Sequence, residues 1–542
     1  MGIDVGALRV RVGRTETSAT EDDRVEANEM AVRGLIATGV LAAMVLAALP
    51  SQASPDGEFV RVAADHWTFE TTRSHQRFVP WGTNFVLYDN KYLNMFGPGI
   101  YDHALYDRVL AVMEALHINL VKAFLPIAKV LPDPQGPEAI RIAPGYLDNV
   151  ADFLSLARRH HIRVVLSLAE WGGNEIRWWH EGGEYFGRSP WKAEGVDALA
   201  VLRSFWSQVG ARFRDNPTLF AYEPCVEWSL PSDNLTWTPP NQQWGRLTTE
   251  PSLWYWWHWA VQRYGSLEAL NKAWGTNYAS VDDVALVDYT YDFQAHRYLD
   301  PQAKILAYQD FREWASYRYL KPQIEAIRRA DPNHMATIAN HMRPPGDLWE
   351  GAAQYFIGLS EPEESDLVDY MTHHDNHSVK EFKGTDYGAL ARAATVRMRS
   401  CLARKRMPIV LEEFSFDSPD PQQVADACSA MARGTVGECS GWMVWFFQAW
   451  EEGSPTGLVD RNLRPTAWGR EFGDLGAPGG FIAKADLSRR RARQVITIDR
   501  ASELVPARHG TLLQVLEHWD NYRHPVDYRW PRNAWITLAL DR

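Results

Sequence analysis

Apolar runs about as long as a buried β-strand recur along the chain. These runs lie at residues 78–85, 118–125, 162–169, 218–227, 335–340, 366–372, 408–414 and 441–447. Helices with one apolar face are predicted after them, at 104–117, 145–161, 195–214, 302–330, 348–357, 386–405, 420–434 and 465–473. Because the runs are apolar nearly throughout, the pattern predicts parallel strands that are covered on both faces.

Eight such strand–helix units are typical of an α/β fold that closes as a (β/α)8 TIM barrel. An open doubly wound sheet is the alternative, but its Gly-rich phosphate turn is missing after the first strand, where the chain reads Trp81-Gly82-Thr83-Asn84. In a (β/α)8 barrel the chemistry lies at the carboxyl ends of the strands. Candidate residues are therefore sought there.

Three segments depart from the repeat. Residues 59–62 and 66–69 predict a hairpin that closes the amino end of the barrel, within a catalytic domain expected at 54–477. An insertion rich in aromatic residues spans about 228–301. From 478 to 542 short alternating runs, among them 481–484 and 494–498, predict a small C-terminal all-β appendage.

The N-terminus carries the features of a secretory signal peptide. Arg33 precedes an apolar run over 34–49, and small residues follow up to Ala53. We expect residues 1–53 to be a signal peptide with an extended polar n-region, cleavage after Ala53 and no stable membrane insertion of the secreted protein. An uncleaved signal anchor is the alternative.

Composition narrows the function. The net charge of −12 argues against binding to nucleic acid, which needs concentrated Lys and Arg. The 24 Trp and the aromatic content of 12% favour a cleft that stacks on sugar rings, although most Trp in any fold are core residues. No spacing of the four Cys and the His residues is typical of a metal site, and no metal or other cofactor is expected.

Two of the strands end in carboxylates, Glu227 and Glu413. A carboxylate at the end of a buried strand is costly unless it is paired or used, so these two are the predicted catalytic pair. Glu223 competes with Glu227 but lies four residues deeper, where a buried hydrogen-bonded network is the expected role. Glu412 is the alternative to Glu413.

Further strand ends supply candidates that line the cleft. Asn84 ends the first strand, and Glu170 and Trp171 follow the third. His374 lies near the end of the sixth strand, with His373 beside it as the alternative. These residues are expected to contact the substrate.

The motifs in three of these strands resemble the clan A glycoside hydrolases, which are retaining enzymes built on a (β/α)8 barrel. The segments 78–84, 408–414 and 441–445 look most like family 5, the cellulase and mannanase family. The insertion segment 264–276 is similar instead to the family 42 β-galactosidases. The resemblance covers roughly residues 58–475.

The resemblance implies roles for individual residues. Glu227 takes the acid/base position and Glu413 the nucleophile position, while His374 lines the cleft and Trp445 forms a sugar platform. Trp81, in the first-strand motif, and Lys122, in the second strand, are placed with the substrate-binding residues.

Three positions depart from the family pattern. Val226 replaces an Asn whose amide contacts the substrate 2-hydroxyl, Lys122 replaces an Arg that supports the nucleophile, and Asn376 replaces a Tyr. Val cannot donate a hydrogen bond, so some transition-state stabilisation is expected to be missing or supplied differently.

The sequence therefore predicts a secreted retaining glycosidase that acts on β-linked poly- or oligosaccharides, with mannan or glucan slightly ahead of β-galactosides. A carbohydrate-binding barrel with weak or no catalysis is the alternative, motivated by Val226. A metal-dependent barrel hydrolase is disfavoured because no His-x-His pair follows the first strand.

Overall fold

The computed structural model describes residues 57–87, 94–132, 141–169, 198–226, 250–284, 287, 291–292, 297–339, 366–379, 382, 386–388, 390–391, 407–449, 453–487, 493–498, 526–529 and 536–541. All of them belong to the second of two compact units, Ser54–Arg542. The predictions for residues 1–53, for the helix at 348–357 and for most of the helix at 386–405 lie outside the described residues.

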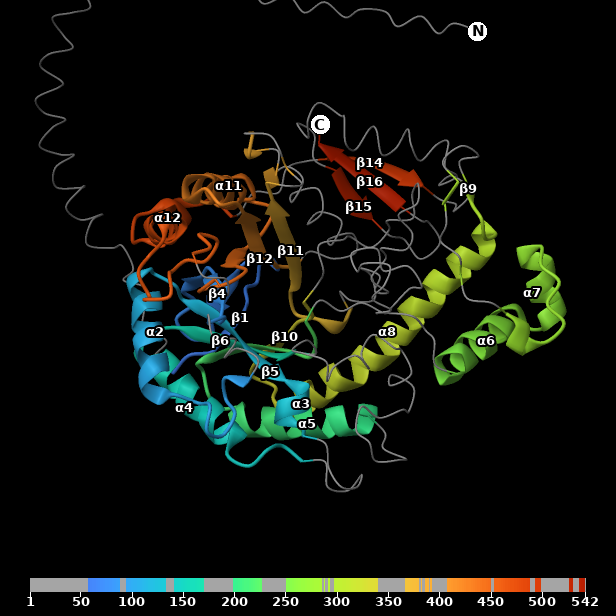
Figure 1. Ribbon diagram of the computed structural model, residues 1–542, viewed down its shortest axis with the longest axis horizontal. Coiled ribbons are helices and arrows are strands. Elements are labelled where there is room, and N and C mark those ends of the chain that lie inside the picture. Colours follow the sequence, from blue (N-terminus) through green and yellow to red (C-terminus); the bar gives the residue numbers. More distant parts are fainter. Residues whose placement is uncertain are drawn as a thin grey trace, which may run out of the picture. The chain divides into compact units, whose positions relative to one another are not determined.

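One sheet of eight parallel strands forms the centre of this unit (Figure 1). In chain order its strands are β4 (Trp81–Asn84), β5 (Leu120–Pro126), β6 (Arg163–Ala169), β7 (Leu219–Glu223), β10 (Met335–Ala336), β11 (Met371–Ser378), β12 (Ile409–Asp417) and β13 (Gly441–Val444). Each strand pairs with its neighbour along the chain except across the gap between β10 and β11, and β13 pairs with β4. The predicted (β/α)8 fold is confirmed.

The gap between β10 and β11 is bridged by threonine side chains. Thr337 Oγ1 donates to the carbonyl oxygen of Tyr370 at 2.7 Å, and Thr372 Oγ1 donates to that of Ile338 at 2.8 Å. A backbone hydrogen bond of 2.9 Å crosses the same gap. The side-chain hydroxyls thus close the ring where the regular ladder is interrupted.

Helices cover the outer face of the sheet. They are α2 (His103–Ala115), α3 (Ile127–Val130), α4 (Tyr146–Arg159), α5 (Ala198–Phe213), α8 (Gln302–Ala330), α11 (Pro421–Gly434) and α12 (Ala467–Gly476). At the starts of α2, α11 and α12, the side chains of Asp102, Asp420 and Thr466 accept hydrogen bonds from backbone N–H groups of the first turn. The apolar faces of these helices and the outward residues of the strands form one continuous core.

Inside the barrel two apolar layers lie at different heights along the strands. The amino-end layer consists of Leu120, Val165, Phe220, Ala221, Met335, Tyr370, Val410 and Met443, joined by Val60 and Phe69. The carboxyl-end layer consists of Val86, Phe124, Ala169, Val226, Ala339, Phe446 and Ala449, with Trp445 packed against it. Since side chains alternate along a strand, one interior position of each strand lies between the two layers.

The predicted hairpin closes the amino end of the barrel. Its strands β1 (Val60–Val62) and β2 (Phe69–Thr71) are antiparallel, and β3 (Arg77–Phe78) pairs with β2. The Phe69 ring packs edge-on against the rings of Phe220 and Tyr370, with centroids 5.3 and 5.5 Å apart. This plug keeps water from the amino-end layer.

The insertion after β7 builds an aromatic core of its own. It contains α6 (Glu250–Tyr264), α7 (Leu267–Trp274), a 3-10 turn at Val281–Asp283 and the short strands β8 (Tyr291–Asp292) and β9 (Arg297–Tyr298). The buried Trp256 stacks on Trp274 and packs edge-on against Tyr308 of α8. The aromatic content of this segment is therefore at least partly structural.

The C-terminal region contains an antiparallel sheet of β14 (Arg493–Ile498), β16 (Ile536–Asp541) and β15 (Val526–Arg529), in that order. The prediction of a strand at 481–484 is wrong, because Phe481–Lys484 forms the short helix α13. Four residues are too few to show a period, and here Ile482 is buried while the Arg433 guanidinium lies over the Phe481 ring. Among the described residues, no helix is long and apolar enough to cross a membrane.

Candidate active site

A layer of polar side chains fills the barrel between the two apolar layers. We call it the polar layer; its members are Lys122, Ser167, Glu223, Thr337, Thr372 and Glu412, and all are buried. In the sequence Lys122, Ser167, Glu223 and Thr337 are each a polar residue inside an apolar run, as in Leu120-Val121-Lys122-Ala123-Phe124. Ionic groups enclosed by apolar layers are costly unless they pair with each other.

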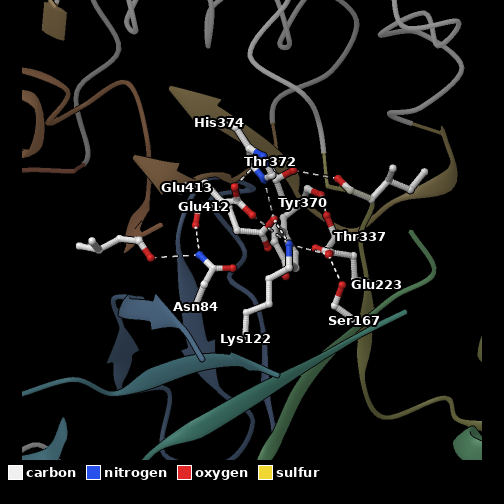
Figure 2. A network of polar contacts seen from close by, with 12 residues as sticks. Asn84, Lys122, Ser167, Glu223, Thr337, Tyr370, Thr372, His374, Glu412 and Glu413 are labelled. Carbon is white, nitrogen blue, oxygen red and sulfur yellow. Dashed lines mark hydrogen bonds and ion pairs between the residues drawn. The ribbon is translucent and has the colours of Figure 1, made fainter. Parts of the chain in front are cut away.

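Lys122 is the centre of the polar layer (Figure 2). Its Nζ lies 2.7 Å from Glu223 Oε1, 3.1 Å from Glu412 Oε2 and 3.8 Å from Glu413 Oε1. Burial would lower the pKa of Lys122, but the three glutamate charges outweigh burial and raise that pKa well above its ordinary value. Lys122 has no exposed surface, so it acts on the carboxylates rather than on a substrate.

Glu223 occupies the side of Lys122 that faces away from Glu413 (Figure 2). Ser167 Oγ donates to its Oε1 at 2.5 Å. Burial, together with the nearby charge of Glu412, raises the pKa of Glu223 to about 8 although Lys122 opposes the shift. The expectation of a buried hydrogen-bonded role for Glu223 is confirmed.

A β-bulge brings both Glu412 and Glu413 to the interior. Along the pairing of β11 with β12, His373 lies opposite Leu411 and His374 lies opposite Glu413, so Glu412 is the extra residue. The pairing of β12 with β13 is irregular over the same stretch. Bulges of this kind re-aim side chains, and this one lets two consecutive carboxylates reach Lys122.

His374 contacts both of these carboxylates. Its Nε2 lies 3.3 Å from Glu412 Oε2 and its Nδ1 lies 3.3 Å from Glu413 Oε2. Both ring nitrogens can donate only in the imidazolium form, which this arrangement favours. Of the two histidines expected in this place, the structure therefore brings His374 to Glu413.

Asn84 lies at the end of β4 and holds the bulged strand. Its Nδ2 donates to the carbonyl oxygens of Glu412 and Val444, each at 3.0 Å. Its Oδ1 is buried and has no hydrogen-bond partner among the residues that the structure describes. Asn84 thus lies beside the candidate nucleophile, with an acceptor available.

Electrostatics separates the two neighbouring carboxylates. Burial opposes ionisation of Glu412, but the charge of Lys122 and the hydrogen bond with His374 lower the pKa of Glu412 to about 2. Glu413 lies farther from Lys122, and it lies within β12, which continues to Asp417 instead of ending at Glu413 as predicted. Glu412 is accordingly a buried charge partner, and Glu413 remains the candidate nucleophile.

Two tryptophans expected at the substrate lie in different places. Trp445 follows β13, is only partly buried and packs against the carboxyl-end layer, which suits a sugar platform. Trp81 instead faces the helices: it stacks on Phe472 with ring centroids 4.0 Å apart and donates to the Phe472 carbonyl oxygen. A Cβ on Gly476 would lie 2.4 Å from the Trp81 indole nitrogen, so this pocket is filled. Trp81 is an outer core residue, not part of the cleft.

Several candidates lie outside the described residues: Glu227, Glu170 and Trp171. Val226, directly before Glu227, is described and packs in the carboxyl-end layer with Phe124 and Ala169. In the part of the chain that the structure describes, no group of three or more His, Cys, Asp or Glu is arranged to hold a metal ion.

Sequence reasoning missed Ser167, Thr337 and Thr372, and it named Glu412 only as an alternative. A usable signal was present for Ser167 and Thr337, because each is a buried polar residue inside an apolar run. Such a residue must find partners inside the barrel.

Comparison with known proteins finds similarity to glycoside hydrolases. The model of the β-galactosidase family, glycoside hydrolase family 42, matches residues 200–425. A subfamily 18 member of glycoside hydrolase family 5 from Streptomyces cattleya, in complex with Manβ1-4GlcNAc, is similar in structure with a TM-score of 0.51 and 13% identity, over 79% of this chain and 87% of that one.

An endo-1,4-β-mannanase from Rhizomucor miehei gives a TM-score of 0.46 at 14% identity, over 72% of this chain and 91% of that one. The comparison with curated protein sequences found no match.

The barrel is similar in fold to that of a glycoside hydrolase, and the matched segment is similar to the β-galactosidase family. The barrel is similar to that of the Streptomyces cattleya family 5 enzyme.

Proposed function

We propose that this protein is a secreted retaining glycosidase that cleaves β-linked poly- or oligosaccharides, with Glu413 as nucleophile and Glu227 as acid/base. The observation that carries the proposal is the setting of Glu413, which lies within the seventh barrel strand between Lys122 and His374. Two cationic groups beside a carboxylate favour the ionised form that a nucleophile needs.

In the proposed mechanism Glu227 protonates the leaving oxygen while Glu413 attacks the anomeric carbon and forms a glycosyl-enzyme. Glu227 then removes a proton from water, which displaces Glu413 and releases the sugar with its configuration retained. The two carboxyl groups of retaining enzymes lie about 5–5.5 Å apart.

Mannan-like substrates are proposed first. The Streptomyces cattleya enzyme of similar fold binds Manβ1-4GlcNAc, and the part-exposed Trp445 offers an apolar face to a sugar ring. β-Galactosides are the second choice, because the β-galactosidase family model matches residues 200–425.

A carbohydrate-binding barrel with weak catalysis is the second candidate function. Val226 favours it, because an apolar side chain in the carboxyl-end layer cannot donate a hydrogen bond to a substrate hydroxyl. Retention of charged Glu413 beside Glu412 favours the enzyme instead, since crowded carboxylates are costly without a use.

Hydrolysis of a panel of aryl β-glycosides and β-glycans by the protein from Ser54 tests the proposal. We expect turnover of a mannoside or glucoside by the unaltered protein and loss of nearly all of it in Glu413→Ala. Binding of an oligosaccharide without turnover of any substrate would contradict the glycosidase proposal and favour the carbohydrate-binding barrel.

Secretion is proposed from the N-terminal pattern of Arg33, the apolar run at 34–49 and the small residues before Ser54. N-terminal sequencing of exported protein should begin at or near Ser54. A mature chain that still carries the apolar run would contradict cleavage.

A further inference from the structure

The polar layer and the adjoining active-site groups contain more carboxyl groups than cations. Lys122 and the imidazolium form of His374 supply two positive charges, while Glu223, Glu412 and Glu413 supply three carboxyl groups. All five side chains are buried, between apolar layers. A net charge there is costly, so one carboxyl group is expected to keep a proton.

Two carboxyl oxygens mark where this proton lies. Glu223 Oε2 and Glu412 Oε1 are buried and accept no hydrogen bond from any residue that the structure describes. Glu223 Oε1 and Glu412 Oε2 lie 2.7 and 3.1 Å from the same atom, Lys122 Nζ, so the two carboxyl groups are neighbours on one ammonium group. Ionised carboxylates only accept hydrogen bonds, so a hydrogen bond between these two requires a proton on one of them.

The contacts of each group decide which one carries the proton most of the time. Glu412 Oε2 lies within 3.3 Å of both Lys122 and His374, so it is the better anion. Among the described residues, Glu223 has Lys122 alone as its cation, and Ser167 as a neutral neighbour. Burial and the charge of Glu412 raise the pKa of Glu223 to about 8, which agrees with this assignment.

We propose that Glu223 and Glu412 share one proton and act with Lys122 as positioning residues that fix the charge around Glu413. This inference rests on the proposed function insofar as it assigns Glu413 as nucleophile. The proton moves between the two carboxyl groups only. The pair formed by Glu223 and Glu412 therefore carries one negative charge, whichever group holds the proton. Glu413 therefore faces a constant charge.

The other described groups that face this pair of carboxyl groups leave the count of charges unchanged. Tyr370, before β11, is neutral because burial and the charges of Glu412 and Glu223 raise its pKa well above the ordinary value. Asn84 and Thr337 are uncharged. Lys122 and His374 are the cations already counted, and Glu227 lies outside the described residues.

Charge sharing has a signature in paired variants. In Glu223→Gln a neutral group replaces a neutral group, and Glu412 stays ionised. In Glu412→Gln the shared proton is no longer held, so Glu223 ionises beside Lys122 and restores the negative charge. Only the double variant removes that charge, which leaves Lys122 with Glu413 alone and favours the ionised form of Glu413.

The pH profile of kcat/KM tests this signature, because its acidic limb reports the ionisation of the nucleophile. We expect either single variant to move the acidic limb by less than about half a pH unit, and the double variant to move it to lower pH by about one unit or more. A purely structural role would change rates without this non-additive shift. A shift in Glu412→Gln as large as in the double variant would overturn the proposal.

Infrared difference spectroscopy gives a readout that needs no activity and no double variant. The unaltered protein should show a protonated carboxyl absorption that both single variants lack and that Glu227→Gln, a control for the acid/base proton, retains. Raising the pH should remove it with a midpoint near the pKa of Glu223, about 8. Persistence of the absorption in both single variants would overturn the shared proton.

The two readouts separate this inference from the proposed function. If the protein hydrolyses no substrate but shows the protonated carboxyl absorption, the glycosidase proposal and the effect on Glu413 as nucleophile are contradicted, while the shared proton is established. Hydrolysis with no such absorption would overturn the shared proton and leave the glycosidase.

Discussion

Replacement of Lys122 by Met tests whether the polar layer holds the barrel together. The change keeps the volume and the chain length of the side chain but removes the ammonium group that Glu412 and Glu413 contact. At an effective dielectric of about 20, each contact at the 3.1 and 3.8 Å separations is worth about 4–5 kcal/mol before the cost of burying the ions. Removing one partner of a buried pair typically costs about 3–5 kcal/mol, which is the loss expected here.

The loss in Lys122→Met should depend on pH. In the unaltered protein Lys122 keeps the pKa of Glu412 below its unfolded value, so this contact stabilises the fold above that value and is lost only in strong acid. Without the ammonium group, the buried carboxyl groups take up protons more readily. The variant should therefore be most destabilised near pH 8 and least near pH 5.

Urea unfolding midpoints of both proteins at pH 5 and pH 8 provide the measurement. Lys304→Met is a matched control, since Lys304 is also buried but pairs with Asp300, whose side chain is 18% exposed. The control should lose less stability, with little change between the two pH values. Equal midpoints for Lys122→Met and the unaltered protein at both pH values would refute the reasoning.

Other substitutions test separate parts of the account. Between about pH 4.5 and 8 the folded protein holds a proton on Glu223 that the unfolded chain has released, so stability should fall with rising pH by up to about 1.4 kcal/mol per unit, and Glu223→Gln should flatten this slope in urea titrations. Trp81→Ala should cost about 3–5 kcal/mol through lost packing on Phe472, whereas Trp445→Ala should mainly raise KM; the reverse result would exchange their roles. Thr337→Val should lower stability by about 1–3 kcal/mol, read from the thermal midpoint, because it leaves a buried carbonyl oxygen at the barrel seam without its partner.

The fold followed from the sequence because eight apolar runs separated by amphipathic helices admit few other arrangements. The strands β5, β6 and β12 lie within or close to the predicted ranges. The same apolar character hid which face of each strand turns inward. Trp81 was therefore placed in the cleft although it faces the helices, while Asn84, three residues later, faces the interior.

The site was predictable only in part, for a related reason. Glu413 and His374 could be named because each lies near the end of a predicted apolar run, although the strands continue to Asp417 and Ser378. Lys122 could be named through the family resemblance. The bulge that turns Glu412 inward has no signal in the sequence, since it depends on how β12 pairs with both neighbours. At 481–484 the run was too short for its period to distinguish a strand from a helical turn.

The central claim is that Glu413 forms a covalent bond to the sugar. Incubation with an activated 2-deoxy-2-fluoro glycoside of the sugar that the protein hydrolyses, followed by digestion and mass spectrometry, tests it directly. The account predicts one added sugar per chain, on the peptide that contains Glu413 and at that residue. A label on Glu412, or inactivation without any covalent label on this strand, would contradict it.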